Sequence, residues 1–373
     1  MTSYKYKPDK ACPKCFAYPW LREYILTEST TKGTCPNCRS RNQPLISVSY
    51  LYDAFENLIS AYQPVEDSSI EAGSAILNLI QDDWEVFSEK IIENDRAGIL
   101  LEAIMISGWD DDSGDPILGA YDLYVARHNH WAHDKLEDIW DKFAYEVKSN
   151  PNNELRFHDP LFSEFLIEEL IGTRTIRYPT GTILYRARLG FTVYADGTKP
   201  YQGLAMGAPP PEKAGPGRAN PKGKVVLYCA NRENTAVAEV RPARGEYTSV
   251  AEVHTTKDLN LLDLSAEPEW PNPFTDESIN YRVEFAGLMA GFAEGLSKPL
   301  RSRDDTTDYI PSQKLVDLIQ KERTDGIIYP SAMEPTGTNV VLFDPTVVQI
   351  GSSRLVEIVD VRVQFQDAQI DDD

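Results

Sequence analysis

The sequence lacks a long apolar run. Its 373 residues contain no apolar stretch near the ~18 residues that are needed to cross a bilayer. Residues 1–10 are charged and no apolar stretch follows them, so neither a secretory signal nor a membrane anchor is expected. The expectation is a cytoplasmic protein without a membrane partner.

Positive charge is also scarce. The chain has 37 Lys and Arg against 58 Asp and Glu, and its net charge of −21 argues against broad binding of nucleic acid by the whole chain. The imbalance is uneven, because residues 1–44 hold three acidic side chains and eight basic ones: Lys5, Lys7, Lys10, Lys14, Arg22, Lys32, Arg39 and Arg41. This basic segment is a candidate site for nucleic acid or for a partner protein.

Cysteine is nearly absent beyond residue 38. Four of the five cysteines lie in two pairs, Cys12-Pro-Lys-Cys15 and Cys35-Pro-Asn-Cys38. Two such turns bring four thiolates around a tetrahedral zinc ion, and this clustering suits a reducing compartment better than a disulfide framework does. We expect a structural Zn²⁺ in a zinc ribbon over residues 1–45, because so short a segment cannot build its own core.

Hydrophobic periodicity divides the rest of the chain. Apolar side chains recur at helical spacing between residues 76 and 91 and between residues 136 and 147. Residues 46–150 are therefore predicted to form an all-α domain. A polar, turn-rich stretch at residues 148–156 marks the predicted boundary. Residues 151–373 are predicted to form a mixed α/β domain, which makes the whole chain α+β.

The C-terminal domain is predicted from short β-type runs that alternate with helices. A loop rich in Pro and Gly occupies residues 207–223. The predicted helices lie near residues 233–241, 280–296 and 311–322, and the predicted strands are Ile183–Tyr185, Val225–Cys229, Val250–His254, Leu259–Leu264, Ile327–Tyr329, Val340–Phe343 and a last strand from Val359 to Phe365.

Four segments of this domain together resemble the RES domain family, over roughly residues 175–350. In the family's order they are Leu184-Tyr-Arg186-Ala-Arg188, then Gly217-Arg218-Ala-Asn220, then Tyr228 followed eleven residues later by Glu239, and finally Gly326-Ile-Ile-Tyr-Pro-Ser331 followed by Gly337-Thr-Asn339. The segment from Tyr309 to Gln313 fits the same pattern. Arg186, Glu239 and Ser331 match the triad that gives the family its name.

The resemblance implies a fold similar to that of ADP-ribosylating toxins and an activity that consumes NAD⁺. Members of the family release nicotinamide by hydrolysis or phosphorolysis, or transfer ADP-ribose to a protein. Many are toxins that an antitoxin protein neutralises. We therefore expect an NAD⁺-degrading enzyme, a toxin or defence effector regulated by its N-terminal half. Water, phosphate and protein stay open as acceptors.

The chemistry suggests a role for each matched residue. Cleavage of the nicotinamide–ribose bond passes through a transition state like an oxocarbenium ion, and Glu239 is predicted to favour that charge. Arg186 offers a planar fork for a phosphate, and Tyr228 offers a ring for nicotinamide. Ser331 is expected to bind the carboxamide or the ribose, or to orient Glu239. Further predicted substrate-binding residues are Arg188, Arg218 and Asn339.

Two nucleotide-binding motifs are missing. Neither G-x-x-x-x-G-K-[ST] nor G-x-G-x-x-G opens a predicted helix. NAD⁺ is therefore expected as a substrate and not as a bound redox carrier. Taken singly, each site residue also has a structural interpretation, such as an ion pair for Arg186 or a solvated helix position for Glu239.

The run from Arg127 to His133 supports a second hypothesis. It loosely resembles the Arg- and His-containing motif of HEPN domains, which are often RNases. In that role His133 would act as acid or base and Arg127 would hold a phosphate. Such nucleases usually need a dimer, so a homo-oligomer is expected. As a third hypothesis, residues 1–150 are a recognition module that holds the C-terminal domain inactive, and we favour this role for them.

Overall fold

The computed structural model describes residues 8–65, 73–108, 119–126, 136–149, 164–276, 278–298 and 306–362. The chain divides into two compact units. Unit 1 comprises Met1–Lys135 and Glu269–Ala286, and unit 2 comprises Leu136–Pro268 and Gly287–Asp373. Both contain helices and strands, so the predicted α+β class is confirmed. No helix in the described part of the chain is long and apolar enough to cross a membrane.

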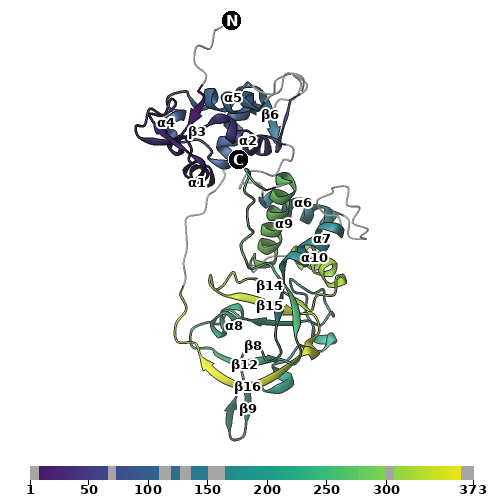
Figure 1. The fold of residues 1–373 in the computed structure, drawn as a ribbon. Coiled ribbons are helices and arrows are strands. Elements are labelled where there is room, and N and C mark those ends of the chain that lie inside the picture. Colours follow the sequence, from purple (N-terminus) through teal and green to yellow (C-terminus); the bar gives the residue numbers. More distant parts are fainter. Residues whose placement is uncertain are drawn as a thin grey trace, which may run out of the picture. The chain divides into compact units, whose positions relative to one another are not determined.

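Unit 1 begins with a small antiparallel sheet around the cysteine pairs (Figure 1). Its strands follow the order β1-β3-β2, and a helix, α1, crosses between the two cysteine turns. The segments are β1 (Lys10–Ala11), α1 (Pro19–Glu28), β2 (Thr31–Gly33) and β3 (Gln43–Ser47).

Short helices follow the ribbon and share its core. They are α2 (Tyr52–Ile59), α3 (Ile76–Trp84), α4 (Glu89–Ile92) and α5 (Ala97–Ser107). The apolar spacing between residues 76 and 91 belongs to two helices and not to one, because Glu85 ends α3 in the left-handed conformation with a φ of 48°. The Phe16 ring of the ribbon stacks on Phe87 with 5.8 Å between the centroids, so ribbon and helices bury one apolar cluster.

The structure adds a three-stranded sheet to the segment that was predicted to be helical only. Its order is β4-β6-β5, with β4 at Tyr62–Pro64, β5 at Ser74–Ala75 and β6 at Leu123–Ala126. Strands of two to four residues carry too little alternation to be read from sequence. Arg127, His133 and the intervening residues lie outside the described part of the chain.

Unit 2 is built on an eight-stranded sheet with the order β16-β12-β8-β11-β15-β14-β13-β7. All neighbouring strands pair antiparallel except β13 and β14. The strands are β7 (Thr175–Tyr178), β8 (Ile183–Leu189), β11 (Leu227–Ala230), β12 (Tyr247–Thr255), β13 (Leu259–Asp263), β14 (Gly326–Pro330), β15 (Thr338–Leu342) and β16 (Val348–Glu357). A separate hairpin consists of β9 (Thr192–Tyr194) and β10 (Gly197–Lys199).

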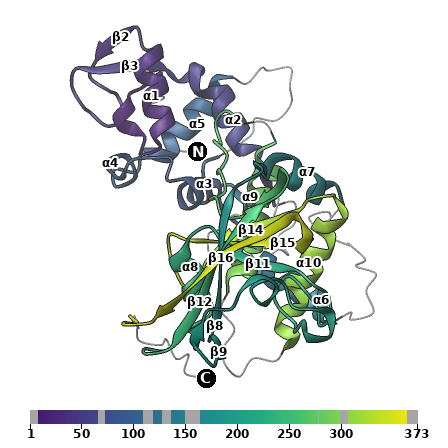
Figure 2. The same cartoon turned by 90° about the horizontal axis from the view of Figure 1, so that it is seen from below.

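Helices cover both faces of this sheet. Figure 2 shows α8 on one side and α6 and α10 on the other. Trp140 of α6 packs on Phe143 and on Phe292 of α9. The helices are α6 (Leu136–Ser149), α7 (Glu164–Arg174), α8 (Glu233–Glu239), α10 (Ile310–Lys321) and α9 (Ile279–Ser297), which belongs to unit 2 from Gly287 onward.

The central strands and helices of unit 2 confirm the sequence prediction, but the end of the chain does not. The last strand of the described residues is β16 at Val348–Glu357, and residues 358–362 are not in a strand, while residues 363–365 of the predicted strand lie outside the described part of the chain. β16 was missed because Gly351, Ser352 and Ser353 interrupt its apolar alternation. The division at residues 45 and 150 stays a prediction.

Candidate functional site

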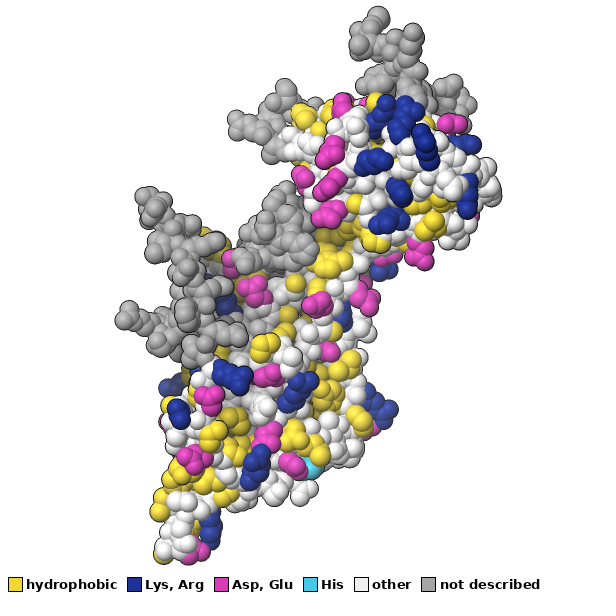
Figure 3. Space-filling model, turned by 90° about the vertical axis from the view of Figure 1, so that its left-hand side faces the viewer, with side chains coloured by type: hydrophobic (Ala, Val, Ile, Leu, Met, Phe, Trp, Pro, Cys, Tyr) yellow, Lys and Arg dark blue, Asp and Glu magenta, His cyan; other side chains and the backbone are white. Residues whose placement is uncertain are grey.

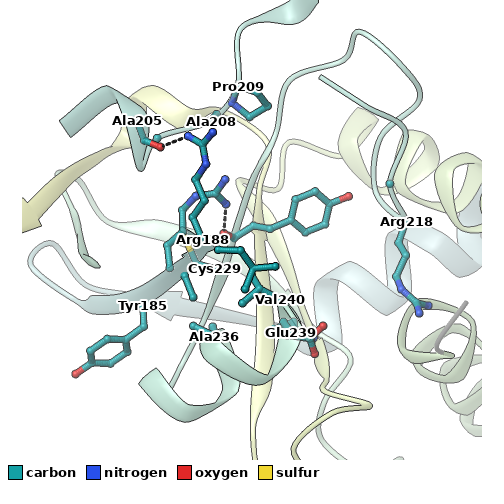
Figure 4. A pocket seen from close by; sticks show the side chains of 18 of the residues that line it. Tyr185, Arg188, Ala205, Ala208, Pro209, Arg218, Cys229, Ala236, Glu239 and Val240 are labelled. Carbon is teal, nitrogen blue, oxygen red and sulfur yellow. Dashed lines mark hydrogen bonds between the residues drawn. The ribbon is translucent and has the colours of Figure 1, made fainter. Parts of the chain in front are cut away.

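Unit 2 contains a cavity of about 1060 Å³ between β8, β11, α8 and the Pro- and Gly-rich loop (Figure 4). Basic residues outnumber acidic ones in its lining, because Glu239 is the one acidic residue among the described residues that line it. The cationic lining residues are Arg186, Arg188, Lys213 and Arg218. In a chain of net charge −21, this local excess of positive charge favours an anionic ligand.

Arg186 and Arg188 lie two residues apart on β8, so their side chains leave the same face of the strand. Arg186 donates from Nη1 to the Tyr228 carbonyl oxygen at 2.6 Å, while its buried Nε has no partner. Burial lowers the pKa of Arg186, and the neighbouring Arg188 lowers it further. Arg188 donates to the Ala205 carbonyl at 2.7 Å. Among the described acidic residues, none forms an ion pair with either guanidinium.

Glu239 is the last residue of α8. The helix has seven residues, of which two are alanine, the best helix former, and Arg241 follows it with a φ of 48°. The carboxylate oxygen Oε1 accepts two hydrogen bonds, from Ser331 Oγ at 2.6 Å and from Asn339 Nδ2 at 2.8 Å. Both donors are anchored by the β14–β15 hairpin, so the sheet fixes the direction of the carboxylate.

The Ser331 hydroxyl is fully engaged. Besides donating to Glu239, its oxygen accepts from the backbone N–H groups of Met333 at 3.1 Å and Glu334 at 3.2 Å. A hydroxyl has one proton and two lone pairs, and all three are used here. Ser331 is also only 7% exposed. The geometry therefore favours the orienting role over contact with a ligand.

A second link ties the same loop to α8. Thr235 lies one turn before Glu239, is fully buried, and donates from Oγ1 to Glu334 Oε2 at 3.0 Å. Gly337 passes so close that an added Cβ would lie 2.0 Å from Thr235 Oγ1. Hydrogen bonds from Thr336 and Thr235 lower the pKa of Glu334. The loop of residues 331–339 is thus hydrogen-bonded to α8 at two positions one helical turn apart, Thr235 and Glu239.

Tyr228 presents its ring to the cavity while its hydroxyl is used elsewhere. The hydroxyl donates to Asn220 Oδ1 at 2.8 Å and accepts from the Ala219 N–H at 3.0 Å. Burial raises the pKa of Tyr228 to about 12, so the phenol is neutral. An added Cβ at Gly217 would lie 2.6 Å from this hydroxyl, so any larger residue there would have to displace the Tyr228 side chain.

The start of α10 holds the turn that carries Arg218. Gln313 donates from Nε2 to the carbonyl oxygens of Gly217 at 2.8 Å and Asn220 at 2.9 Å, and Ser312 Oγ donates to the Arg218 carbonyl at 2.8 Å. These two residues fit the family pattern in the sequence, but the pattern alone assigned them no role. Figure 4 shows Arg218 on the far side of the cavity from Arg188.

The predicted zinc ligands come together in unit 1. The Sγ atoms of Cys12, Cys15, Cys35 and Cys38 are buried and lie within 4.8 Å of one another. A tetrahedral ion with Zn–S bonds of about 2.3 Å requires sulfur atoms about 3.8 Å apart. The distances are 3.4 Å for Cys12–Cys38 and 3.5 Å for Cys15–Cys35. Hydrogen bonds among the four thiols lower the pKa of Cys35 and Cys38 and raise that of Cys15, and the thiolate form is the one that zinc binds. The four residues fit a closed, structural zinc site.

Basic side chains surround this ribbon. Figure 3 shows Lys and Arg gathered over one part of unit 1, with acidic side chains beside them. Five of the basic ribbon residues are exposed: Lys14, Arg22, Lys32, Arg39 and Arg41. The predicted basic segment is therefore a surface feature, and its partner stays a prediction.

Comparison with known proteins identifies one domain. A family model described as the RES domain matches residues 183–363, in agreement with the resemblance predicted from the sequence. A solved structure of the M. tuberculosis MbcT–MbcA toxin–antitoxin complex contains a chain that is 17% identical, with 52% of this chain and 92% of that chain covered and a TM-score of 0.31. None of the curated proteins matches the chain.

Proposed function

Since residues 183–363 of this chain form a RES domain, we propose that its cavity binds NAD⁺ and cleaves the nicotinamide–ribose bond. One observation carries the proposal. A carboxylate fixed by two hydrogen bonds lines the same cavity as two neighbouring guanidinium groups that have no acidic partner among the described residues. The substrate has the complementary charges, which are a diphosphate and a ribose that becomes cationic.

Arg186 and Arg188 are the proposed diphosphate site. Two neighbouring guanidinium groups repel each other, and the burial of Arg186 adds a desolvation cost. A dianionic group relieves both penalties, and the buried Nε of Arg186 has no protein partner to give up. Arg218 and Lys213, also in the lining, are proposed to assist from other parts of the wall.

Glu239 is proposed to stabilise the oxocarbenium-like transition state. Because Ser331 and Asn339 both hold Oε1, the other oxygen, Oε2, is left to meet the ribose. Nicotinamide leaves as a neutral molecule, so the reaction needs no strong general acid. Ser331 and Asn339 are then positioning residues, and the Tyr228 ring, whose hydroxyl is already bonded, offers a flat surface for nicotinamide.

The proposed biological role is that of a toxin or defence effector held in check by a protein. Two apolar side chains in the cavity lining, Leu189 and Leu204, are exposed, and Leu204 is 96% accessible to solvent. Apolar groups at the mouth of a polar cavity suit contact with another protein. This role predicts that expression of the chain stops growth, and that Glu239→Gln, which removes the charge and keeps the shape, restores it.

The enzymatic proposal is tested by following NAD⁺ with purified protein, with and without phosphate, and by mass spectrometry of the products. ADP-ribose alone means hydrolysis, whereas phosphorylated ADP-ribose formed only with phosphate means phosphorolysis. Glu239→Gln should abolish NAD⁺ loss, and the matched control Glu267→Gln, an exposed residue outside the cavity, should not. His133→Ala should retain it. Turnover that survives Glu239→Gln and disappears with His133→Ala would refute the assignment.

A further inference from the structure

Unit 1 contains a cavity of its own, of about 460 Å³, which is the size of a small-ligand site. Its chemistry is unusual for a surface depression because it combines aromatic with acidic side chains. We call it the acidic aromatic cavity and define it by Tyr18, Asp82, Asp83, Trp84, Glu85 and Trp270. All six belong to unit 1, although Trp270 comes from a segment far along the chain.

The lining carries negative charge only. Three carboxylates contribute to it, and none of the described residues that line it is Lys or Arg. Asp82 and Glu85 are exposed, and no ion pair joins either of them to a described basic residue. Burial raises the pKa of Tyr18, and the carboxylate of Asp276 raises it further, which places another negative group near the same wall.

The aromatic part of the wall is held in place. Tyr62 donates its hydroxyl proton to Asp83 Oδ2 at 2.6 Å and accepts from the Trp84 indole N–H at 3.2 Å. The segment bearing Trp270 is anchored to α2, since Asn57 Nδ2 donates to the carbonyl oxygens of Pro273 and Asp276 at 3.0 Å each. Trp270 remains 40% exposed, so part of its indole is accessible.

From this combination we infer that the acidic aromatic cavity binds a guanidinium group. An indole face attracts a cation, and a guanidinium is planar, stacks on aromatic rings and donates paired hydrogen bonds to a carboxylate. A quaternary ammonium would use the rings but has no N–H for the carboxylates. The residues that line the proposed NAD⁺ cavity all belong to unit 2, so the two cavities share no residue. Its ligand is either a free arginine derivative or an arginine side chain of a peptide.

The test uses the full-length, zinc-loaded protein with L-argininamide as the probe, followed by calorimetry and tryptophan fluorescence. We expect a Kd on the order of 0.1–1 mM, as befits a single small group. Asp82→Asn combined with Glu85→Gln should weaken binding about tenfold or more, since both charges are lost. Glu93→Gln, an exposed acidic change on the same unit outside the cavity, is the matched control and should have no effect.

Further arms make the result decisive. Tetramethylammonium chloride carries the charge without N–H donors and should bind clearly more weakly, so equal binding would overturn the guanidinium assignment. Unchanged affinity in the double variant, or in Trp270→Leu with Trp84 intact, would overturn the site. So would the absence of argininamide binding at about 10 mM, ten times the upper expected Kd. A short peptide with one arginine then separates the sources: tighter binding than argininamide identifies a peptide ligand, and equal binding a small molecule. NAD⁺ turnover is measured in parallel with the same protein, so that a failure of guanidinium binding and a failure of the proposed enzymatic function can be told apart.

Discussion

Replacement of Ser331 by alanine tests how Glu239 is positioned. In the native protein Ser331 Oγ donates to Glu239 Oε1 at 2.6 Å and accepts from two backbone N–H groups. Ser331→Ala leaves Asn339 as the remaining donor to that oxygen. A hydrogen bond to a charged group contributes about 1.5–3 kcal/mol. If the carboxylate is held for the transition state, kcat should therefore fall about 10- to 150-fold.

The division between kcat and KM distinguishes the two roles of Ser331. Since all three hydrogen-bonding positions of its hydroxyl are used within the protein, we expect KM for NAD⁺ to change little. The assay is steady-state NAD⁺ consumption, with unfolding in urea to record the accompanying loss of stability, about 1–3 kcal/mol from the two freed N–H groups. Ser265→Ala is the matched control, because this serine also donates to a carboxylate, Asp263 Oδ1, at 2.6 Å outside the cavity lining.

Ser265→Ala should lower stability without lowering kcat. A Ser331→Ala variant with raised KM and unchanged kcat would refute the reasoning, because it would mean that the hydroxyl binds the substrate. A loss of activity in both serine variants would point to general destabilisation.

Three further predictions follow from the same geometry. Arg186→Met should abolish NAD⁺ turnover. The free energy of unfolding should stay equal or rise by about 1 kcal/mol, because the substitution removes a buried charge that has no carboxylate partner. A loss of stability above about 2 kcal/mol in urea would contradict this prediction. Chelation of zinc under reducing conditions should unfold unit 1. In a thermal unfolding curve the part of the transition that comes from unit 1 should then disappear, and added zinc should restore it. An unchanged unfolding curve would exclude a structural metal. The pKa of Tyr228 is raised to about 12 in the folded protein, whereas it is near 10 in the unfolded chain. The free energy of unfolding should therefore fall as the pH rises from 10 to 12, and Tyr228→Phe should make this fall less steep. An equally steep fall in the variant would show that the phenol ionises normally.

The sequence predicted the strands that carry strong apolar runs and missed structure that depends on distant packing. Val340 and Val341, for example, predict β15. A strand at the centre of a sheet is buried on both faces, so its sequence is a run of apolar, β-branched residues. β16 lies at the edge and includes Gly351, so it carries no such run. Glu85 adopts the left-handed conformation that separates α3 from α4. The sequence does not predict this break, because glutamate, unlike glycine, has no preference for a positive φ.

The site divides in the same way. Arg186, Glu239 and Ser331 were predicted because a pattern of residue types in a fixed order marked them. That Ser331 orients Glu239 was one of the predicted alternatives, but the supporting contacts of Thr235 and Gln313 were not predicted, because the sequence alone gives these polar residues no role. Their roles exist only once the 331–339 loop and the turn at Gly217 come within hydrogen-bonding distance. A sequence states which side chains are present, whereas loop closure decides which backbone groups they meet.

The order of strands explains why a pattern spread over so many residues can be specific. β8 carries Arg186, β11 leads directly into α8 with Glu239, and the β14–β15 hairpin carries Ser331; these strands are neighbours in the order β8-β11-β15-β14. Arg186 thus lies on a strand, Glu239 on the helix that follows a strand, and Ser331 directly after the end of a strand. Successive residues in a helix point about 100° apart, so one residue inserted between β11 and Glu239 would turn the carboxylate away from both of its donors. The site therefore depends on the spacing between Tyr228 and Glu239 in this chain as much as it depends on the residues themselves.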